Sequence, residues 1–101
     1  IGSKTVEDLQ SYRAQIAFLG TNGIDINHGF STVDPDEAAV KKAMIEHANE
    51  TIVLADNSKF GSSYSALFAN FKNIDRVVTD VDADRLHVEK LTSQGIEVDL
   101  A

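Results

Sequence analysis

Short apolar runs that alternate with helix-like stretches constrain the fold more than any other feature of this sequence. The clearest run covers residues 51–55, which are apolar and rich in β-branched side chains, a pattern typical of a strand covered on both faces. A similar run at residues 15–19 ends at Gly20, and another covers residues 75–79. Residues 96–100 alternate between apolar and polar side chains, as an edge or half-exposed strand does. Four strands are therefore predicted.

The strongest helix signal lies between the first two of these runs. Asp34 can cap a helix, Pro35 fits its first position, and Glu37 stands at the capping-box position. We expect this helix to run to about residue 48. The side chains expected on or beside its apolar face are Ala39, Val40, Ala43, Met44 and Ala48.

Two further helices are predicted near the ends of the chain. Ser3 precedes residues 5–9, which are typical of a short capped helix with acidic residues in its first turn. Residues 83–93 are expected to form a helix with Leu86 and Leu91 facing inward and Gly95 as its C-terminal cap.

Strands that alternate with helices predict an α/β fold with a mostly parallel, Rossmann-like sheet flanked by helices. Residues 24–33 show no clear period and are expected to be loop, and residues 64–71 to contain at most a short strand. The 101 residues suffice for one domain and not for two, so residues 1–101 are expected to form a single domain. Because the first residue is not methionine, we expect this domain to be a piece of a longer protein.

Composition excludes several functions for this segment. The net charge is −7 and no basic helix or stripe is visible, so the segment itself is not expected to contact DNA. No apolar run is long enough to cross a bilayer, no signal peptide is visible, and there is no cysteine. These features agree with a reducing cytoplasm and with no membrane partner.

In parallel sheets, ligands bind at the carboxyl ends of the strands. Three polar turns fall at such ends, at residues 20–23, 56–59 and 79–80. The first contains Gly20, Thr21, Asn22 and Gly23, and its backbone N–H groups could bind an anion, although a tight strand exit explains the same residues.

The turn at residues 56–59 is more informative. Lys59 places a positive charge directly after a buried strand, with the hydroxyl of Ser58 beside it and Asp56 able to orient the lysine or bind a sugar hydroxyl. The alternative is a turn in which Asp56 and Ser58 only satisfy their own backbone. Glu37 and Lys41 are second candidates, because a helix start can receive a phosphate, but a solvated ion pair explains them equally well.

Other chemistry finds little support in the sequence. His28, His47 and His87 have no mutual metal spacing and are expected to have surface or packing roles, so no metal site is predicted. No nucleophile elbow, phosphate-binding Walker loop or dinucleotide-binding glycine motif occurs, so neither catalytic residues nor a cofactor are expected.

Four blocks in order resemble the sensor domain of DeoR-family transcription repressors. They are FLGTNGID at residues 18–25, the helix start at 34–37 continued by VKKAMI at 40–45, ADNSKFG at 55–61, and VTD at 78–80. Each block is weak by itself, but together they are specific, and the resemblance covers nearly the whole chain.

The resemblance implies a function and a setting. Members carry an N-terminal winged helix-turn-helix and a C-terminal sensor that binds a phosphorylated sugar, in a fold similar to ribose-5-phosphate isomerase and CoA transferases. Both the DNA-binding domain and the first half of the sensor, with its Gly-Thr-Thr phosphate loop, are absent from this sequence. DNA is then a partner only through the missing domain, and a homo-oligomer is expected by analogy.

The same resemblance bears on catalysis. The isomerases use an Asp-Gly-Ala-Asp turn whose carboxylates transfer protons, and the matching turn here has Leu19 and Asn22, neither of which titrates near neutral pH. Binding without turnover is therefore predicted, with Lys59 neutralising the effector phosphate. The backbone of residues 20–23 and the side chains of Thr21 and Asn22 are expected to line the sugar, and Asp56 to orient Lys59 or accept a hydrogen bond from a sugar hydroxyl. An isomerase-like enzyme and a structural or oligomerisation piece without a ligand remain the alternatives.

Overall fold

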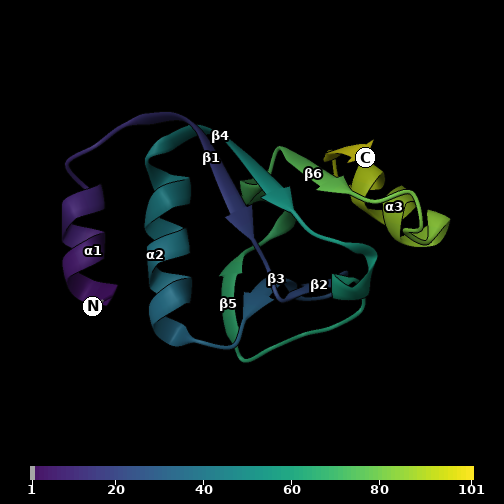
Figure 1. Cartoon of the computed structure of the whole chain (residues 1–101), viewed down its shortest axis with the longest axis horizontal. Coiled ribbons are helices and arrows are strands. Elements are labelled where there is room, and N and C mark those ends of the chain that lie inside the picture. The colour runs from purple at the N-terminus through teal and green to yellow at the C-terminus, as the bar shows by residue number, and fades with distance from the viewer. Residues whose placement is uncertain (1) are drawn as a thin grey trace.

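The computed structural model describes residues 2–101 and contains two sheets (Figure 1). Four parallel strands form the larger sheet, in the order β1-β4-β6-β7, and three antiparallel strands form the smaller one, in the order β2-β3-β5. In chain order the elements are α1 (Gly2–Leu9), β1 (Ala14–Gly20), β2 (Gly23–Asp25), β3 (Gly29–Thr32), α2 (Pro35–Glu46), β4 (Ala48–Leu54), the 3-10 helix η1 (Asn57–Lys59), β5 (Ala66–Ala69), the 3-10 helix η2 (Phe71–Asn73), β6 (Arg76–Thr79), α3 (Arg85–Ser93) and β7 (Glu97–Leu100).

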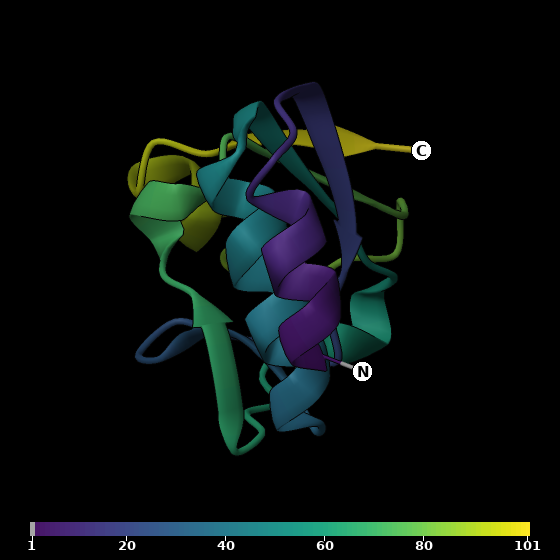
Figure 2. The same ribbon diagram turned by 90° about the vertical axis from the view of Figure 1, so that its left-hand side faces the viewer.

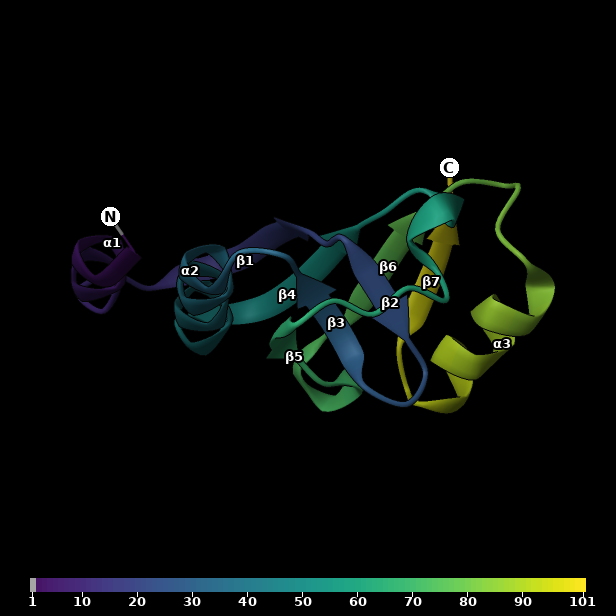
Figure 3. The same ribbon diagram turned by 90° about the horizontal axis from the view of Figure 1, so that it is seen from below.

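The larger sheet confirms the predicted α/β class. Leu19 pairs with Val53, Val53 with Val77, and Val77 with Val98, so one row of apolar side chains crosses all four strands. Helices flank this sheet, with α2 beside β1 and α3 beside β7 (Figure 3). Since the strands are parallel, β1, β4 and β6 all end at the same side of the sheet, which we call its carboxyl edge. Strand β7 is the last in the strand order, so it is an edge strand as predicted.

The core lies between the larger sheet and the elements that pack on one of its faces. Phe30 of β3 is fully buried, and its ring centroid is 6.3 Å from that of Phe68 and 5.5 Å from that of Phe71. Figure 3 shows β2, β3 and β5 packed across the sheet between α2 and α3. The buried apolar cluster comprises Leu19, Ile24, Phe30, Ala38, Val53, Phe68, Ala69, Ile74, Val77, Leu91 and Ile96.

The start of α2 was predicted correctly and its end was not. The Asp34 carboxylate accepts a hydrogen bond from the backbone N–H of Asp36 at 2.9 Å, and Pro35 is the first helical residue. The helix ends at Glu46 with His47 as its C-cap, so the predicted end near residue 48 lies about half a helical turn too late. Ala48 instead begins β4, because its strand must pair with β1.

The buried face of α2 also differs from the prediction. Ala38 and Ala43 are buried, Val40 and Met44 are partly buried, and Ala39 is exposed. Packing against β3, β5 and α1 therefore selects a neighbouring stripe of the helix. Figure 2 shows α1 lying alongside α2.

At the N-terminus, α1 begins before its predicted start. Ser3 lies inside the helix, so it does not cap it, and the first turn contains no acidic residue. Within residues 2–101, neither this helix nor another is long and apolar enough to span a membrane.

Residues 24–33 were predicted as loop and this is wrong, since they contain most of β2 and all of β3. The two strands form a hairpin whose tight end includes Gly29 at φ +91°, a backbone conformation that suits glycine. Strands of three and four residues are too short to show a period in the sequence. The uncertain segment 64–71 does contain a short strand, β5.

Helix α3 corrects one further prediction. Leu91 is 2% exposed and faces the core, but Leu86 is 57% exposed. The two residues are five positions apart, which corresponds to about 140° around a helix, so both cannot face the same neighbour. Gly95 follows the helix at φ +88°, in agreement with the predicted terminating glycine.

Candidate functional site

The turns that follow β4 and β6 meet at the carboxyl edge of the larger sheet. The carboxylate of Asp80 accepts hydrogen bonds from the backbone N–H of Asn57 at 2.6 Å and from its side-chain Nδ2 at 2.8 Å. These bonds, mainly the one from the Asn57 side chain, lower the pKa of Asp80. Asp80 is therefore ionised at neutral pH and fixes the position of the loop that contains Lys59.

Within that loop, Asp56 caps the 3-10 helix η1. Its carboxylate accepts a hydrogen bond from the backbone N–H of Ser58 at 2.8 Å and another from the Ser58 hydroxyl. Hydrogen bonding to Ser58 is the main reason that the pKa of Asp56 is lowered, with a smaller contribution from the charge of Lys59. Asp56 and Ser58 thus form the capped turn considered from the sequence, and this turn presents Lys59.

Lys59 is half-buried at the end of η1. Within residues 2–101, its ammonium donates no hydrogen bond and forms no ion pair, and its charge acts on Asp56 only at longer range. It is therefore a cation at the carboxyl edge whose hydrogen-bonding capacity is available to a ligand.

The loop that follows Lys59 packs against the turn after β1. The backbone N–H of Gly61 donates to the carbonyl of Ile24 at 2.8 Å, and Phe60 and Ile24 form a parallel β-bridge. A Cβ atom at Gly23 would lie 2.3 Å from the carbonyl oxygen of Ser62. Glycine at position 23 is therefore required by close approach of two backbones, and this approach brings the two predicted site segments together.

Lys41 serves the other end of the same edge in a different way. Its Nζ donates to the carbonyl oxygen of Gly20 at 2.6 Å and lies 4.9 Å from the centroid of the Phe68 ring. Burial lowers the pKa of Lys41, and the charge of Glu37 partly opposes that effect. Lys41 thus links α2 to the end of β1. Its ammonium already donates one hydrogen bond, so it has less hydrogen-bonding capacity left for a ligand than Lys59 has.

A polar chain connects the turn after β1 to α2. The Thr32 hydroxyl lies 2.6 Å from Asn22 Oδ1 and 3.0 Å from Glu37 Oε2. A hydroxyl has one proton, so both oxygens cannot be served at once, and rotating the amide so that Asn22 donates to Thr32 satisfies all three groups. Glu37 therefore bonds to Thr32 and not to the backbone N–H of Asp34 as in a capping box.

The Thr21 side chain points into the protein. It is buried, and its hydroxyl lies 2.9 Å from the carbonyl oxygen of Gly23 and 3.0 Å from that of Ser31. The prediction that the Thr21 side chain lines the sugar is therefore wrong, because its hydroxyl is used inside the protein and only the backbone of Thr21 is left to line a ligand. A cavity of about 390 Å³ opens beside this turn and is bordered by Gly20, Glu37 and Lys41.

Three organising residues were not among the site residues predicted from the sequence, namely Thr32, Asn57 and Asp80. Asp80 carried a detectable signal, since it directly follows a strand in the VTD block, and Asn57 lies inside the ADNSKFG block. Thr32 could not be found, because its segment was predicted as loop. Thr79 adds a further polar group at this edge, since its hydroxyl is buried without a hydrogen-bond partner in the described residues.

The three histidines have different neighbours. His28 Nδ1 contacts the Asp25 carboxylate, His47 caps α2, and the His87 ring stacks on Phe60. In the part of the chain that the structure describes, no group of three or more histidine, aspartate or glutamate side chains could hold a metal ion.

Comparison with known proteins places this arrangement in a family. Residues 1–81 match the family described as the DeoR C terminal sensor domain. The chain is 40% identical over 82 residues to the uncharacterized HTH-type transcriptional regulator FruR of Bacillus subtilis, covering 81% of this chain and 33% of that protein. It is 34% identical over 97 residues to the putative aga operon transcriptional repressor of Escherichia coli O157:H7, covering 96% and 36%.

A third relative is matched along almost the whole chain. The glycerol-3-phosphate regulon repressor of Escherichia coli K12 is 28% identical over 100 residues, which cover 99% of this chain and 40% of that protein. The chain thus spans between a third and two-fifths of the length of these relatives. On the family match and these identities, the chain belongs to the family of DeoR C-terminal sensor domains.

Proposed function

We propose that this chain is the effector-sensing part of a DeoR-type transcription repressor and binds a phosphorylated sugar or polyol without converting it. Lys59 is the anchor for the phosphate group, and the backbone of the turn from Gly20 to Gly23 borders the rest of the ligand. The proposal depends on one observation above all. Lys59 is held at the carboxyl edge by a capped loop, and its ammonium has no hydrogen-bond or ion-pair partner among residues 2–101.

The charges around Lys59 favour binding over catalysis. A general base works best when its pKa lies near the operating pH, and the pKa values of Asp56 and Asp80 are both lowered. Near the end of β1, Leu19 is buried in the core, and in the turn that follows Asn22 is bonded to Thr32, so neither offers a proton-transfer group. These features support a sensor and count against the isomerase-like alternative.

We further propose that the chain is the C-terminal part of a larger sensing domain, since it spans only about a third to two-fifths of its relatives. Parallel sheets are normally covered on both faces. Here β1 is an edge strand, and Ile16, Phe18 and Leu54, which share one face of the sheet, are 43%, 57% and 47% exposed. Further helices of the same polypeptide would cover this face, and further strands that pair with β1 would extend the sheet and supply the other wall of the effector site.

In the intact protein the effector acts through a shift between two states. It favours the sensor conformation or oligomer in which the DNA-binding domain holds its operator weakly. The DNA-binding domain is contributed by another part of the polypeptide, in keeping with the net charge of −7 of this segment. A repressor of this kind acts in the cytoplasm as a homo-oligomer.

The test uses the full-length protein and measures its melting temperature with a panel of sugar phosphates, glycerol 3-phosphate and the matching unphosphorylated compounds. A ligand that binds only the folded state raises the melting temperature, so one of the phosphorylated compounds should do so and its unphosphorylated partner should not. Glycerol 3-phosphate is included because one relative is named for that regulon.

The decisive variant is Lys59→Ala, with Lys72→Ala as the matched control because Lys72 is exposed and follows β5. A hydrogen bond to a charged group contributes about 1.5–3 kcal/mol, so Lys59→Ala should weaken effector binding by about tenfold or more and leave operator binding intact. The control should respond as the wild type does. An undiminished response in the Lys59 variant removes this lysine from the site.

A further inference from the structure

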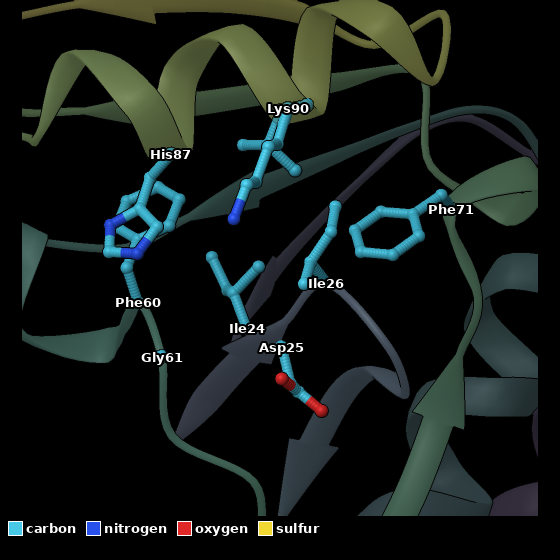
Figure 4. A pocket seen from close by; sticks show the side chains of 9 residues that line it. Ile24, Asp25, Ile26, Phe60, Gly61, Phe71, His87 and Lys90 are labelled. Atoms are coloured by element: carbon cyan, nitrogen blue, oxygen red, sulfur yellow. The ribbon is translucent and has the colours of Figure 1, made fainter.

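We propose that the pocket between α3 and β2 is a second site, separate from the Lys59 site, that binds a compact anionic group such as a phosphate or carboxylate. The pocket has a volume of about 60 Å³. Measured in the same way, the space for one water molecule is about 10–15 Å³, so this pocket suits a small group of a few atoms. Figure 4 shows the residues that line it.

The pocket combines apolar walls with one strongly basic group. Ile24, Phe60, Phe71 and Leu91 form much of its lining. Figure 4 shows the Lys90 side chain extending from α3, with its ammonium between Phe60 and Phe71. Within residues 2–101 this ammonium donates no hydrogen bond and forms no ion pair. Lys90 as a whole is exposed, and an anion in the pocket would give its ammonium a charged partner beside apolar walls.

Two other basic side chains, those of Arg76 and Lys41, do have partners within the protein. Arg76 forms ion pairs of 2.8 Å with both Glu97 and Asp99, and Lys41 donates to the Gly20 carbonyl. Acidic residues outnumber basic ones by 16 to 9, so acceptors are plentiful. Lys90 nevertheless faces a pocket and not a carboxylate.

His87 supplies a second polar group on the same side of α3. It lies three residues before Lys90, which places the two side chains on neighbouring positions of the helix surface. Its ring is stacked on Phe60, with ring centroids 5.2 Å apart and an interplanar angle of 8°. No described residue is hydrogen-bonded to the ring nitrogens of His87, so they are available to an anion.

The one acidic residue that lines the pocket does not neutralise Lys90. The Asp25 carboxylate contacts Nδ1 of His28, and Figure 4 shows it directed away from the Lys90 ammonium. An anion in the pocket would therefore meet two potential donors from α3, while the acidic residue of the lining is engaged with His28.

The pocket lies next to the loop that contains Lys59. Phe60 directly follows Lys59 and is held between His87 and the bridge to Ile24. An anion bound by His87 and Lys90 would hold α3 against this loop and so influence the Lys59 site. The binding itself does not depend on the proposed effector site.

Because inorganic phosphate can also bind at Lys59, the test starts from the full-length Lys59→Ala protein. Its melting temperature is measured against phosphate and acetate at constant ionic strength, with chloride as the reference anion. A saturable rise, with half-saturation in the millimolar range, is expected with one or both anions. Adding Lys90→Gln should weaken the response about tenfold, while adding Lys72→Gln should leave it unchanged.

His87→Phe separates binding from packing, because phenylalanine keeps the stack on Phe60 and removes both nitrogens. This variant should remain as stable as its parent and bind the anion several-fold more weakly. The proposal is overturned if Lys59→Ala shows no saturable response, or if Lys90→Gln and His87→Phe respond as their parent does. Loss of the response to sugar phosphates in Lys59→Ala tests the effector site separately.

Discussion

Replacing Gly23 with alanine would place a methyl group where the backbone of Ser62 already lies. The added Cβ would be 2.3 Å from the Ser62 carbonyl oxygen and 2.9 Å from its carbonyl carbon. Non-bonded heavy atoms are in favourable contact at about 3.5 Å, so the loop after η1 would have to retreat by about 1 Å. The neighbouring Gly20 is the matched control, since a Cβ there meets nothing within 4 Å.

The cost of Gly23→Ala can be estimated from two contributions. Overpacking of this kind costs about 1–3 kcal/mol. Retreat of the loop also breaks the hydrogen bond from Gly61 to Ile24, which contributes about 0.5–1.5 kcal/mol. The free energy of unfolding should therefore fall by about 2–4 kcal/mol, and Gly20→Ala should change it by less than about 1 kcal/mol.

Urea denaturation of the two variants and the wild type measures this difference. Hydrogen exchange adds a local readout, because the Gly61 amide should lose protection in Gly23→Ala and keep it in Gly20→Ala. Gly23→Ala should also weaken effector binding, since the displaced loop contains Lys59. Equal stability of the two variants, with a protected Gly61 amide in both, would refute the close approach of these backbones.

Further substitutions test the orientation of α3 and the hydrogen bonds between Asp80 and Asn57. Leu91→Ala should lower the free energy of unfolding by about 2–5 kcal/mol, because Leu91 is buried. Leu86→Ala should lower it by less than about 1 kcal/mol in the same denaturation assay. Similar values for the two variants would contradict the orientation of α3 in which Leu91 faces the core. Because the pKa of Asp80 is lowered on folding, its carboxylate stabilises the fold fully above the ordinary value of 3.8 and loses this effect as the pH falls through the folded-state pKa. Asp80→Asn should therefore be less stable than wild type at neutral pH, with a difference that shrinks in acid; a difference that stays constant with pH would show that the charge of Asp80 is not the cause.

The candidate site was only partly readable from the sequence. Lys59 and the turn that presents it could be predicted, because a polar loop directly after a buried strand of a parallel sheet lies at the ligand-binding edge. The difference between Lys59 and Lys41 could not, because the partner of Lys41 is the carbonyl of Gly20, 21 positions away. Asp80 was likewise detectable as a strand-end residue, but its bonds to Asn57 span 23 positions.

The sequence by itself determined the alternation of strands and helices and the start of α2 at Asp34 and Pro35. These are local properties, set by hydrophobic periodicity and capping within a few residues. Only the tertiary structure decided that β2, β3 and β5 form a second sheet, that Leu91 and not Leu86 faces the core, and that Lys41 bonds to the Gly20 carbonyl while Lys59 has no partner among residues 2–101. Each of these outcomes depends on packing or hydrogen bonding between segments that are distant in the chain, and a window of neighbouring residues contains no record of such contacts.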